Sequence, residues 1–204
     1  MKLSQATILE KIGEGKFGVV YKAKQHSLGK IVAIKVLNPE LSGSYLSVGR
    51  FLREIKTLGI LDHPNIVKAI DSGEVAGLHY LVMEYYDGIT LEKYIKANGK
   101  LSEEEALNIC YNLAQALYHI WNKGRIHRDV TPENIIIAQG QLKLCDLGLV
   151  RTADTNREHT RYIFPIKSYS FLSPEQLEGK NLDFRSDVYS LGSIIYYALT
   201  GNKA

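Results

Sequence analysis

One stretch of the sequence, IHRDVTPENIIIAQGQLKLCDLG at residues 126–148, decides the fold. It contains two short apolar runs, 134–138 and 141–145, on either side of a Gln-Gly pair. Apolar, β-branched runs around a glycine-bearing turn predict a two-stranded hairpin. Polar side chains stand before the first strand and after the second, so both ends of the hairpin are candidates for chemistry.

Three of these polar residues carry the oxygen atoms that accept protons and bind Mg²⁺ in phosphate chemistry. Asp129 and Asn134 lie five positions apart and can face one cleft from a tight loop. The aspartate can orient a hydroxyl and accept its proton, and the asparagine can ligate Mg²⁺ through oxygen. Asp146 follows the second strand, and its carboxylate also suits Mg²⁺. A capped turn at Asp129 and an ordinary turn at Asp146 are the structural alternatives.

The sequence before this stretch predicts a sheet. Residues 1–85 are rich in alternating apolar and polar positions with β-branched side chains, which is typical of an antiparallel meander. The predicted strands are 6–15, 18–25, 30–37, 65–73 and 78–85. One helical pattern interrupts them, because Phe51, Ile55 and Leu58 recur at helical spacing.

From about Thr90 the period changes to that of helices. A short helix is predicted at 90–98 and a long one at 101–124, for which Ser102 is the expected N-cap and Gly124 the expected stop. Residues 186–201 are again helical and apolar. A β-rich part therefore precedes an α-rich part.

A glycine pattern, G-x-G-x-x-G, places Gly13, Gly15 and Gly18 in the first predicted turn. Glycine lets the backbone approach phosphates and present N–H groups to them. An ordinary glycine-rich turn is one alternative, and a dinucleotide-binding oxidoreductase is another. The latter requires a helix directly after the glycines, whereas residues 18–25 read as a strand.

Lys35 lies on the third predicted strand, where a lone lysine is usually a solvated charge. Glu54, on the following helix, stands one residue before the apolar Ile55 and can reach it. A lysine held by a carboxylate is fixed in direction and available to phosphate oxygens.

In order and spacing, these motifs resemble those of the eukaryotic-type (Hanks-type) Ser/Thr protein kinases over essentially the whole chain. HPNIV, MEYYDG, SPE and SDVYSLG extend the resemblance. It implies an α+β, protein-kinase-like two-lobe fold. Residues 1–85 would form an ATP-binding N-lobe with an antiparallel β-sheet and one helix. Residues 86–204 would form a partial, mainly helical C-lobe with the catalytic loop, the activation segment and a central helix.

The resemblance also implies ATP and Mg²⁺ as cofactors and Ser/Thr hydroxyls of proteins as acceptors. The implied catalytic residues are Asp129, Lys35 and Glu54, and the implied metal ligands are Asn134 and Asp146. The implied nucleotide-binding residues are Gly13, Gly15, Gly18 and Lys35 at the phosphates, and Val20, Ala33, Ile136, Met83, Glu84 and Tyr86 around the adenine.

Composition excludes other classes of protein. The net charge of +3 is too balanced to argue for nucleic acid or an anionic membrane. Two cysteines, Cys110 and Cys145, cannot form a disulfide framework, which favours a reducing, cytoplasmic compartment. No apolar run is long enough for a transmembrane span, and no secretory signal is visible.

The sequence departs from the family pattern at several positions. Leu147 replaces the usual Phe after the metal-binding aspartate, and Thr131 stands where Ser/Thr kinases usually have a lysine. Lys167 and Ser168 replace the expected Gly and Thr, and Lys167 is a candidate substitute for the missing cation. The alternative function is a nucleotide-binding, pseudokinase-like or truncated regulatory module with little transfer activity. Small-molecule kinases of related fold are a further alternative.

Two expectations concern regulation and cover. Arg128 precedes Asp129, and in the family such an arginine grips a phosphorylated activation segment, here with Thr160 or Tyr162 as the candidate site. Because the first predicted strand begins close to Met1, we expect no N-terminal regulatory domain, and the resemblance implies that the family fold continues beyond Ala204. We therefore expect the 186–200 helix to need a partner or a missing C-terminal segment. The residues expected to lose their cover are Leu191, Ile194, Ile195 and Leu199.

Overall fold

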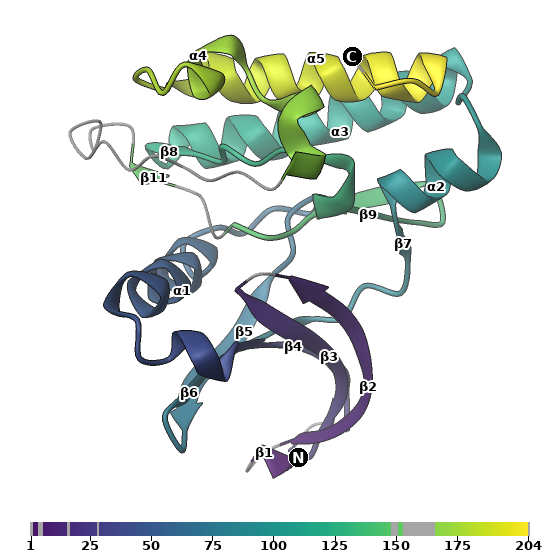
Figure 1. The fold of residues 1–204 in the computed structure, drawn as a ribbon. Coiled ribbons are helices and arrows are strands. Elements are labelled where there is room, and N and C mark those ends of the chain that lie inside the picture. Colours follow the sequence, from purple (N-terminus) through teal and green to yellow (C-terminus); the bar gives the residue numbers. More distant parts are fainter. Residues whose placement is uncertain are drawn as a thin grey trace. The chain divides into compact units, whose positions relative to one another are not determined.

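The computed structural model describes residues 2–3, 6–15, 17–27, 29–147, 151–152 and 166–203 (Figure 1). The chain divides into two compact units. The first contains Met1–Asp62 and Val67–Tyr86, and the second contains His63–Ile66 and Asp87–Ala204. The predicted boundary between an N-lobe that ends at residue 85 and a C-lobe that begins at residue 86 stays a prediction. Each unit is described by itself.

The first unit is an antiparallel sheet with one α-helix. Its six strands are ordered β1-β2-β3-β4-β6-β5. The strands are β1 (Lys2–Leu3), β2 (Ala6–Gly15), β3 (Gly18–Gln25), β4 (Ile31–Leu37), β5 (Ala69–Val75) and β6 (Leu78–Glu84). A 3-10 helix, η1 (Pro39–Leu41), precedes α1 (Tyr45–Leu58). The predicted antiparallel strands and their single helix are confirmed, but the strands do not form a simple meander, because β6 and not β5 lies beside β4.

Strand β4 is interior to the sheet and buried on both faces. Val32, Ile34 and Val36 point to one face and pack with Ala23 and Val82 in an apolar cluster. Helix α1 packs against β5 and β6. Because successive side chains of a strand alternate between faces, the residues of β4 that alternate with Val32, Ile34 and Val36 point to the other face of the sheet.

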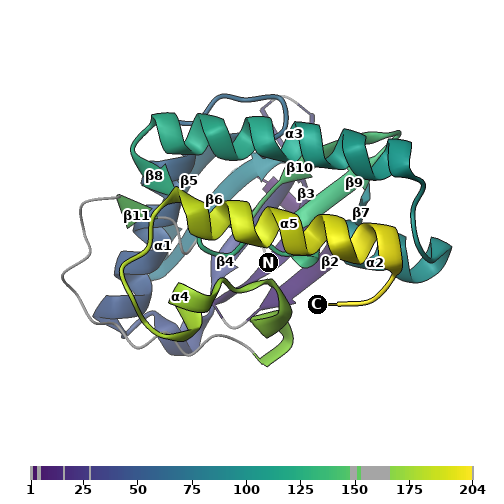
Figure 2. The same cartoon turned by 90° about the horizontal axis from the view of Figure 1, so that it is seen from above.

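The second unit is mainly helical, which confirms the α+β class. Its helices are α2 (Leu91–Asn98), α3 (Glu103–Asn122), α4 (Pro174–Leu177) and α5 (Phe184–Thr200), with the 3-10 helices η2 (Pro132–Asn134) and η3 (Ile166–Phe171). Its strands are β7 (Ile89–Thr90), β8 (Arg125–Ile126), β9 (Ile135–Ala138), β10 (Gln141–Leu144) and β11 (Arg151–Thr152). Helices α3 and α5 lie side by side in both views (Figures 1 and 2).

Local signals set the ends of these elements. Ser102 caps α3 and shares a capping box with Glu105: the Ser102 Oγ accepts the Glu105 N–H at 3.2 Å, and a Glu105 carboxylate oxygen accepts the Ser102 N–H at 3.1 Å. Gln139 and Gly140 join β9 to β10 with φ values of +50° and +74°. Two positive φ values are typical of a tight hairpin turn whose twist matches that of the strands.

The expected loss of cover on α5 is wrong for Ile194, which is fully buried. The reason is that α3 and η3 both pack against α5 within the second unit. Leu199 is 38% exposed, as expected. The most exposed apolar side chains of α5 are those of Val188, Tyr189 and Tyr196. They lie on the side of the helix that is turned away from its buried face.

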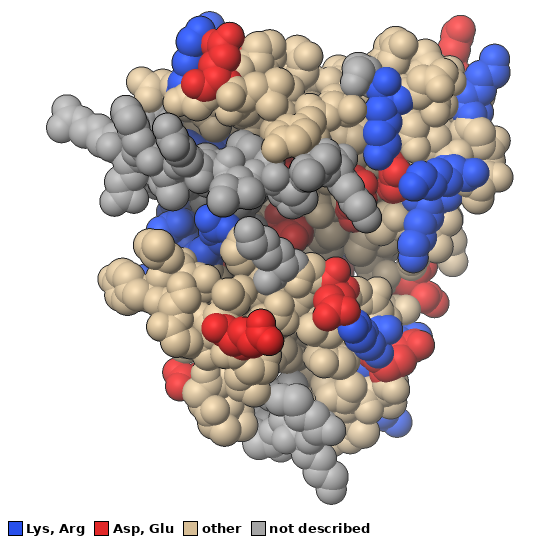
Figure 3. All heavy atoms as spheres, viewed as in Figure 1, with Lys and Arg blue, Asp and Glu red and all other residues tan. Residues whose placement is uncertain are grey.

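Charges of both signs lie close together on the face shown in Figure 3. On the surface of the first unit, Lys22 pairs with Glu10 at 3.4 Å. None of the helices in the described residues is long and apolar enough to cross a bilayer.

Candidate active site

Lys35 and Glu54 form a buried ion pair in the first unit. The Lys35 Nζ donates to both carboxylate oxygens of Glu54, at 2.8 and 2.9 Å. Lys35 is 8% exposed and Glu54 3% exposed. The predicted reach of Glu54 from α1 to β4 is confirmed. A bidentate, desolvated carboxylate fixes the direction of the ammonium group, as a phosphate-binding lysine requires.

The sheet register places further predicted residues on the face that carries Lys35. Val20 is directly opposite Lys35, and Ala33 is directly opposite Met83. Directly opposite residues project to the same face, as do residues two apart on one strand. The lysine and three of the predicted adenine-binding side chains therefore share one face, opposite to the valine-rich cluster.

Two glycines of the β2–β3 hairpin, Gly15 and Gly18, differ in what a side chain would meet. A Cβ at Gly18 would lie 2.4 Å from the carbonyl oxygen of Val36, so the protein's own backbone excludes a side chain there. A Cβ at Gly15 would meet nothing within 4 Å. Gly15 thus leaves open space at the tip of the hairpin, where a phosphate could approach the backbone. Gly18 is needed for the packing of β3 against β4.

The other predicted nucleotide-binding residues are less constrained. The Glu84 N–H donates to the Lys68 carbonyl at 2.9 Å, and a backbone hydrogen bond from Glu84 to an adenine stays a prediction. Tyr86 is half-buried at the end of the first unit. Ile136 lies on β9 in the second unit and is half-buried, and its placement beside Val20 and Ala33 stays a prediction.

In the second unit, Asp129 and Asn134 are joined within one loop. The Asn134 Nδ2 donates to the Asp129 carbonyl at 2.9 Å and to the Asp129 Oδ2 at 3.0 Å. This orients the Asp129 carboxylate and turns the amide so that its oxygen is the atom that can ligate a metal. The predicted proximity of the two residues is confirmed.

Asp146 is brought to the same loop by the backbone. Cys145, the residue before it, donates its N–H to the Asn134 carbonyl at 2.8 Å. Asp146 itself has φ +59°, a sparsely populated conformation for a residue other than glycine. In the described residues no three His, Cys, Asp or Glu side chains gather as a metal site. One carboxylate and one amide oxygen fit Mg²⁺, which usually keeps several waters and binds substrate phosphates.

The structure adds positioning residues to which the sequence analysis gave no role. The Asp187 carboxylate, on α5, accepts the backbone N–H groups of His127 and Arg128, both at 2.8 Å. The Gln176 Nε2, on α4, donates to the Arg128 carbonyl at 2.8 Å. Arg128 has φ +71°, so these bonds hold the residue before Asp129 in an unfavourable conformation. Asp187 is a carboxylate within the otherwise apolar helix predicted at 186–201, and this was the signal in the sequence that could have revealed its role.

Burial shifts the pKa values of two groups behind this loop. It lowers the pKa of His127 to about 4, so the ring is neutral at pH 7 and its Nδ1 accepts the Asp129 N–H at 3.3 Å. Burial also raises the pKa of Asp187 to about 6, against the opposing effect of the two backbone N–H bonds. The expected packing role of His127 is confirmed by its complete burial.

Of the four positions that depart from the family pattern, the structure describes the side chains of two. Leu147 is 1% exposed, so an apolar residue is still packed at this position. Thr131 is buried, and its carbonyl accepts the Asn134 N–H at 3.0 Å. Thr160 and Tyr162 lie outside the described residues, as do the side chains of Lys167 and Ser168.

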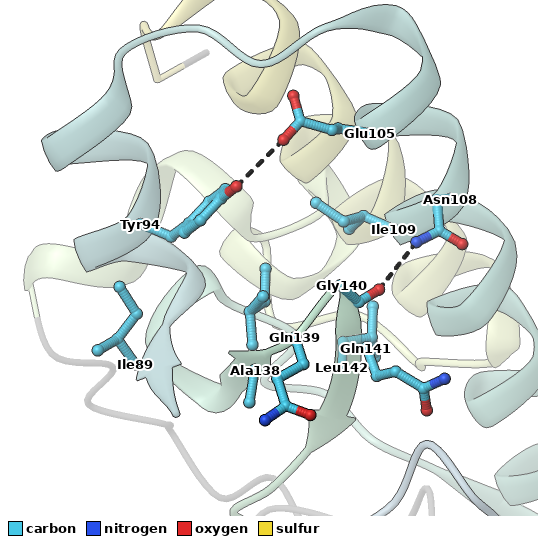
Figure 4. Close-up of a pocket in the computed structure, with 11 residues that line it drawn as sticks. Ile89, Tyr94, Glu105, Asn108, Ile109, Ala138, Gln139, Gly140, Gln141 and Leu142 are labelled. Atoms are coloured by element: carbon cyan, nitrogen blue, oxygen red, sulfur yellow. Dashed lines mark hydrogen bonds between the residues drawn. The ribbon is translucent and has the colours of Figure 1, made fainter. Parts of the chain in front are cut away.

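A separate cavity of about 350 Å³ lies among α2, α3 and the β9–β10 hairpin (Figure 4). The Tyr94 hydroxyl donates to Glu105 at 3.1 Å, and Asn108 donates to the Gly140 carbonyl at 3.1 Å. None of the predicted site residues lines it. The two bonds connect α3 to α2 and to the hairpin turn, which is a structural role.

The chain is similar to known protein kinases. The family described as "Protein kinase domain" matches residues 6–204. The chain is 40% identical over 196 residues to the serine/threonine-protein kinase PrkC of Bacillus subtilis, covering 95% of this chain and 30% of the relative. It is 40% identical over 198 residues to the serine/threonine-protein kinase PknB of Mycobacterium tuberculosis, covering 94% of this chain and 32% of the relative. A probable serine/threonine-protein kinase of Clostridium perfringens is 38% identical over 196 residues, covering 95% and 28%. The chain spans less than a third of the length of these relatives.

Proposed function

Because the chain belongs to the protein kinase domain family, we propose that it transfers the γ-phosphate of ATP to Ser/Thr hydroxyls of proteins, with Mg²⁺ as the metal. The observation that carries this proposal is the buried pair between Lys35 Nζ and the Glu54 carboxylate at 2.8 and 2.9 Å. Phosphoryl transfer by protein kinases requires such a Lys–Glu pair to be in place.

In the first unit, Lys35 would bind the α- and β-phosphates, and Glu54 would keep its ammonium group directed at them. The hairpin tip at Gly15 would present backbone N–H groups to the phosphates. Val20, Ala33 and Met83 would offer apolar contacts to the adenine from the same sheet face. These residues bind and orient the donor, and positioning of this kind supplies much of the catalysis in phosphoryl transfer.

In the second unit, Asp129 would orient the acceptor hydroxyl and take its proton. Asn134 holds the Asp129 carboxylate through its amide nitrogen at 3.0 Å, which leaves its oxygen for the metal. Asn134 and Asp146 would hold Mg²⁺, which when bound neutralises the charge that develops on the phosphate oxygens. Asp187 and Gln176 would act as positioning residues for the loop.

The proposal also includes the cellular compartment and the regulation of the chain. A reducing, cytoplasmic compartment is supported by Cys110 and Cys145, neither of which forms a disulfide. Control by phosphorylation at Thr160 or Tyr162 is supported by the position of Arg128 before Asp129. No observation favours the pseudokinase-like alternative, since all the relatives compared above are named as protein kinases.

The direct test is incubation of the chain with γ-labelled ATP and Mg²⁺, followed by mass spectrometry of the phosphorylated protein. We expect phosphate on serine and threonine, and a loss of at least about a hundredfold in the matched variant Asp129→Asn. Phosphate found mainly on tyrosine would contradict the Ser/Thr assignment. Equal labelling by the wild type and Asp129→Asn would contradict the assigned role of Asp129.

A further inference from the structure

The tip of the β2–β3 hairpin is held by two residues that lie outside the hairpin. The Asn38 N–H donates to the Phe17 carbonyl at 3.2 Å, and the Asn38 Nδ2 donates to the Gly15 carbonyl at 3.4 Å. The hairpin tip lies beside α1 (Figure 1), where the guanidinium carbon of Arg50 is 4.4 Å from the ring centre of Phe17. We call Asn38 and Arg50 the tip clasp. All four residues belong to the first unit.

The side chain of Asn38 is committed to the hairpin tip. Asn38 is the N-cap of η1, a position at which asparagine commonly accepts a backbone N–H of the helix that follows. Its side chain makes no such capping bond here and donates to Gly15 instead. The backbone bond from Asn38 to Phe17 extends the β3–β4 ladder by one step beyond the pair of Gly18 and Leu37. The amide of Asn38 therefore serves the tip and not η1.

Both hydrogen bonds of Asn38 end on carbonyl oxygens. A carbonyl oxygen repels a phosphate, whereas a backbone N–H attracts one. Donors that hold the carbonyls of Gly15 and Phe17 therefore favour a tip that accepts an anion. A glycine-bearing tip without such bonds would sample more conformations, and binding would have to restrict them.

Arg50 holds the tip through an aromatic ring. A guanidinium within about 6 Å of a ring centre is attracted to the face of the ring. Arg50 and Phe17 are both half-buried, so water screens this attraction less than it would at a fully exposed position.

The same face of α1 also serves Lys35. Arg50 stands four residues before Glu54, so the two side chains lie on one face of the helix, one turn apart. The Glu54 carboxylate accepts the Lys35 Nζ at 2.8 Å. Helix α1 thus contacts both the hairpin tip and the lysine that the proposed function assigns to the phosphates.

We propose that Asn38 and Arg50 are positioning residues for the triphosphate of ATP, and that they hold the hairpin tip in the conformation that binds the phosphates. This inference rests on the proposed kinase function, because it names residues that prepare the ATP site of that function. Asn38 acts through the carbonyls of Gly15 and Phe17, and Arg50 acts through the ring of Phe17.

The test compares two ligands by calorimetric titration of the whole chain. MgATP carries the phosphates, and adenosine lacks them. The readout is the ratio of the Kd for adenosine to the Kd for MgATP, in the wild type, Asn38→Ala, Arg50→Ala and the matched control Arg53→Ala. Arg53 is an exposed arginine of the same helix. The melting temperature of each variant is measured alongside.

We expect Asn38→Ala and Arg50→Ala each to lower this ratio about threefold, the effect of losing one hydrogen bond or one cation–ring contact. The Kd for adenosine should stay at the wild-type value, and Arg53→Ala should leave the ratio unchanged. A purely structural role predicts a lower melting temperature with an unchanged ratio, and that result would overturn the proposal. If one of the two variants does not fold, the other decides by the same criterion.

The route through Phe17 is tested by a double variant. If Arg50 acts on the ring, Arg50→Ala lowers the ratio in the wild-type background but not in a Phe17→Leu background. An equal decrease in both backgrounds would show that Arg50 acts without Phe17, which would overturn its assigned role.

These outcomes are separable from the proposed function, because binding needs no phosphoryl transfer. A chain that shows the expected ratios but transfers no phosphate to protein refutes the kinase activity and leaves the tip clasp standing. A chain that transfers phosphate and keeps the same ratio in every variant refutes the tip clasp alone.

Discussion

The Asp187 carboxylate accepts the backbone N–H of Arg128 at 2.8 Å, across 59 positions of sequence. Arg128 has φ +71° and directly precedes the proposed catalytic base Asp129. A non-glycine residue in this region costs of order 1–3 kcal/mol and persists only where its surroundings enforce it. Helix α5 therefore sets the conformation of the loop that contains the proposed base Asp129.

The first prediction concerns the stability of this loop. Asp187→Ala leaves two buried N–H groups without their acceptor, and we expect it to lower the free energy of unfolding by about 3 kcal/mol. Chemical denaturation followed by circular dichroism measures the change. The matched control is Glu178→Gln, an exposed carboxylate of the same unit, which should stay within about 0.5 kcal/mol of the wild type. Equal stabilities of the two variants would show that Asp187 does not hold the loop.

The second prediction concerns pH. The folded-state pKa of His127 is about 4, below its ordinary value of 6.5, so the unfolded chain binds the extra proton between these pH values. His127 thus contributes stability that is complete above pH 6.5 and is lost as the pH falls towards 4. The full contribution is about 3 kcal/mol. Denaturation at pH 7 and pH 4 should show it as the difference between the wild type and His127→Asn.

Asp187 acts in the opposite sense over nearly the same range. Its folded-state pKa of about 6 lies above the ordinary 3.8, so its contribution is greatest at low pH and is lost as the pH rises towards 6. Because these two contributions oppose each other, the free energy of unfolding of the wild type should change little over this pH range. A constant stability difference between the wild type and His127→Asn from pH 4 to 7 would contradict the assigned shift of His127.

The third prediction separates two glycines of one hairpin. Gly18→Ala places a methyl group 2.4 Å from the Val36 carbonyl oxygen and should destabilise the first unit by about 1–3 kcal/mol. Gly15→Ala meets nothing within 4 Å and should keep the wild-type stability while raising the Kd for ATP several-fold. Thermal unfolding and calorimetric titration with MgATP measure the two effects. The reverse pattern would show that Gly15, not Gly18, is the packing residue.

The fourth prediction concerns the alignment of Lys35. Glu54→Gln keeps the size of the side chain but removes the charge that holds Lys35 Nζ at 2.8 Å. We expect kcat/KM for ATP to fall about tenfold, equivalent to about 1.4 kcal/mol. The matched control is Glu10→Gln, whose carboxylate pairs with Lys22 on the surface at 3.4 Å. Equal rates in the two variants would remove Glu54 from the site.

The sequence predicted the features that depend on local signals. Ser102 and Glu105 fixed the start of α3, and the Gln139-Gly140 turn fixed the β9–β10 hairpin, because capping and turn chemistry act between near neighbours. The reach of Glu54 to Lys35 could also be predicted, since the helix follows its strand closely and the apolar Ile55 indicates which face is buried.

Contacts between distant segments could not be predicted in the same way. The bond from Arg128 to Asp187 depends on how α5 packs against the loop, and the contact of Arg50 with Phe17 depends on how α1 packs against the hairpin tip. The cover of Ile194 within the second unit was missed for the same reason, since the apolar pattern of a helix does not show which neighbour covers it.

The most direct test of the account is whether Lys35, the proposed ATP-binding residue, and Asp129, the proposed base for the acceptor hydroxyl, are both required in one chain for transfer of the γ-phosphate. The rate of γ-phosphate transfer is measured for Lys35→Met, for Asp129→Asn and for an equimolar mixture of the two variants. We expect each variant to lose at least about a hundredfold, or about 3 kcal/mol, and the mixture to stay as slow as its components. Recovery of the wild-type rate in the mixture, or either variant alone keeping that rate, would contradict the account.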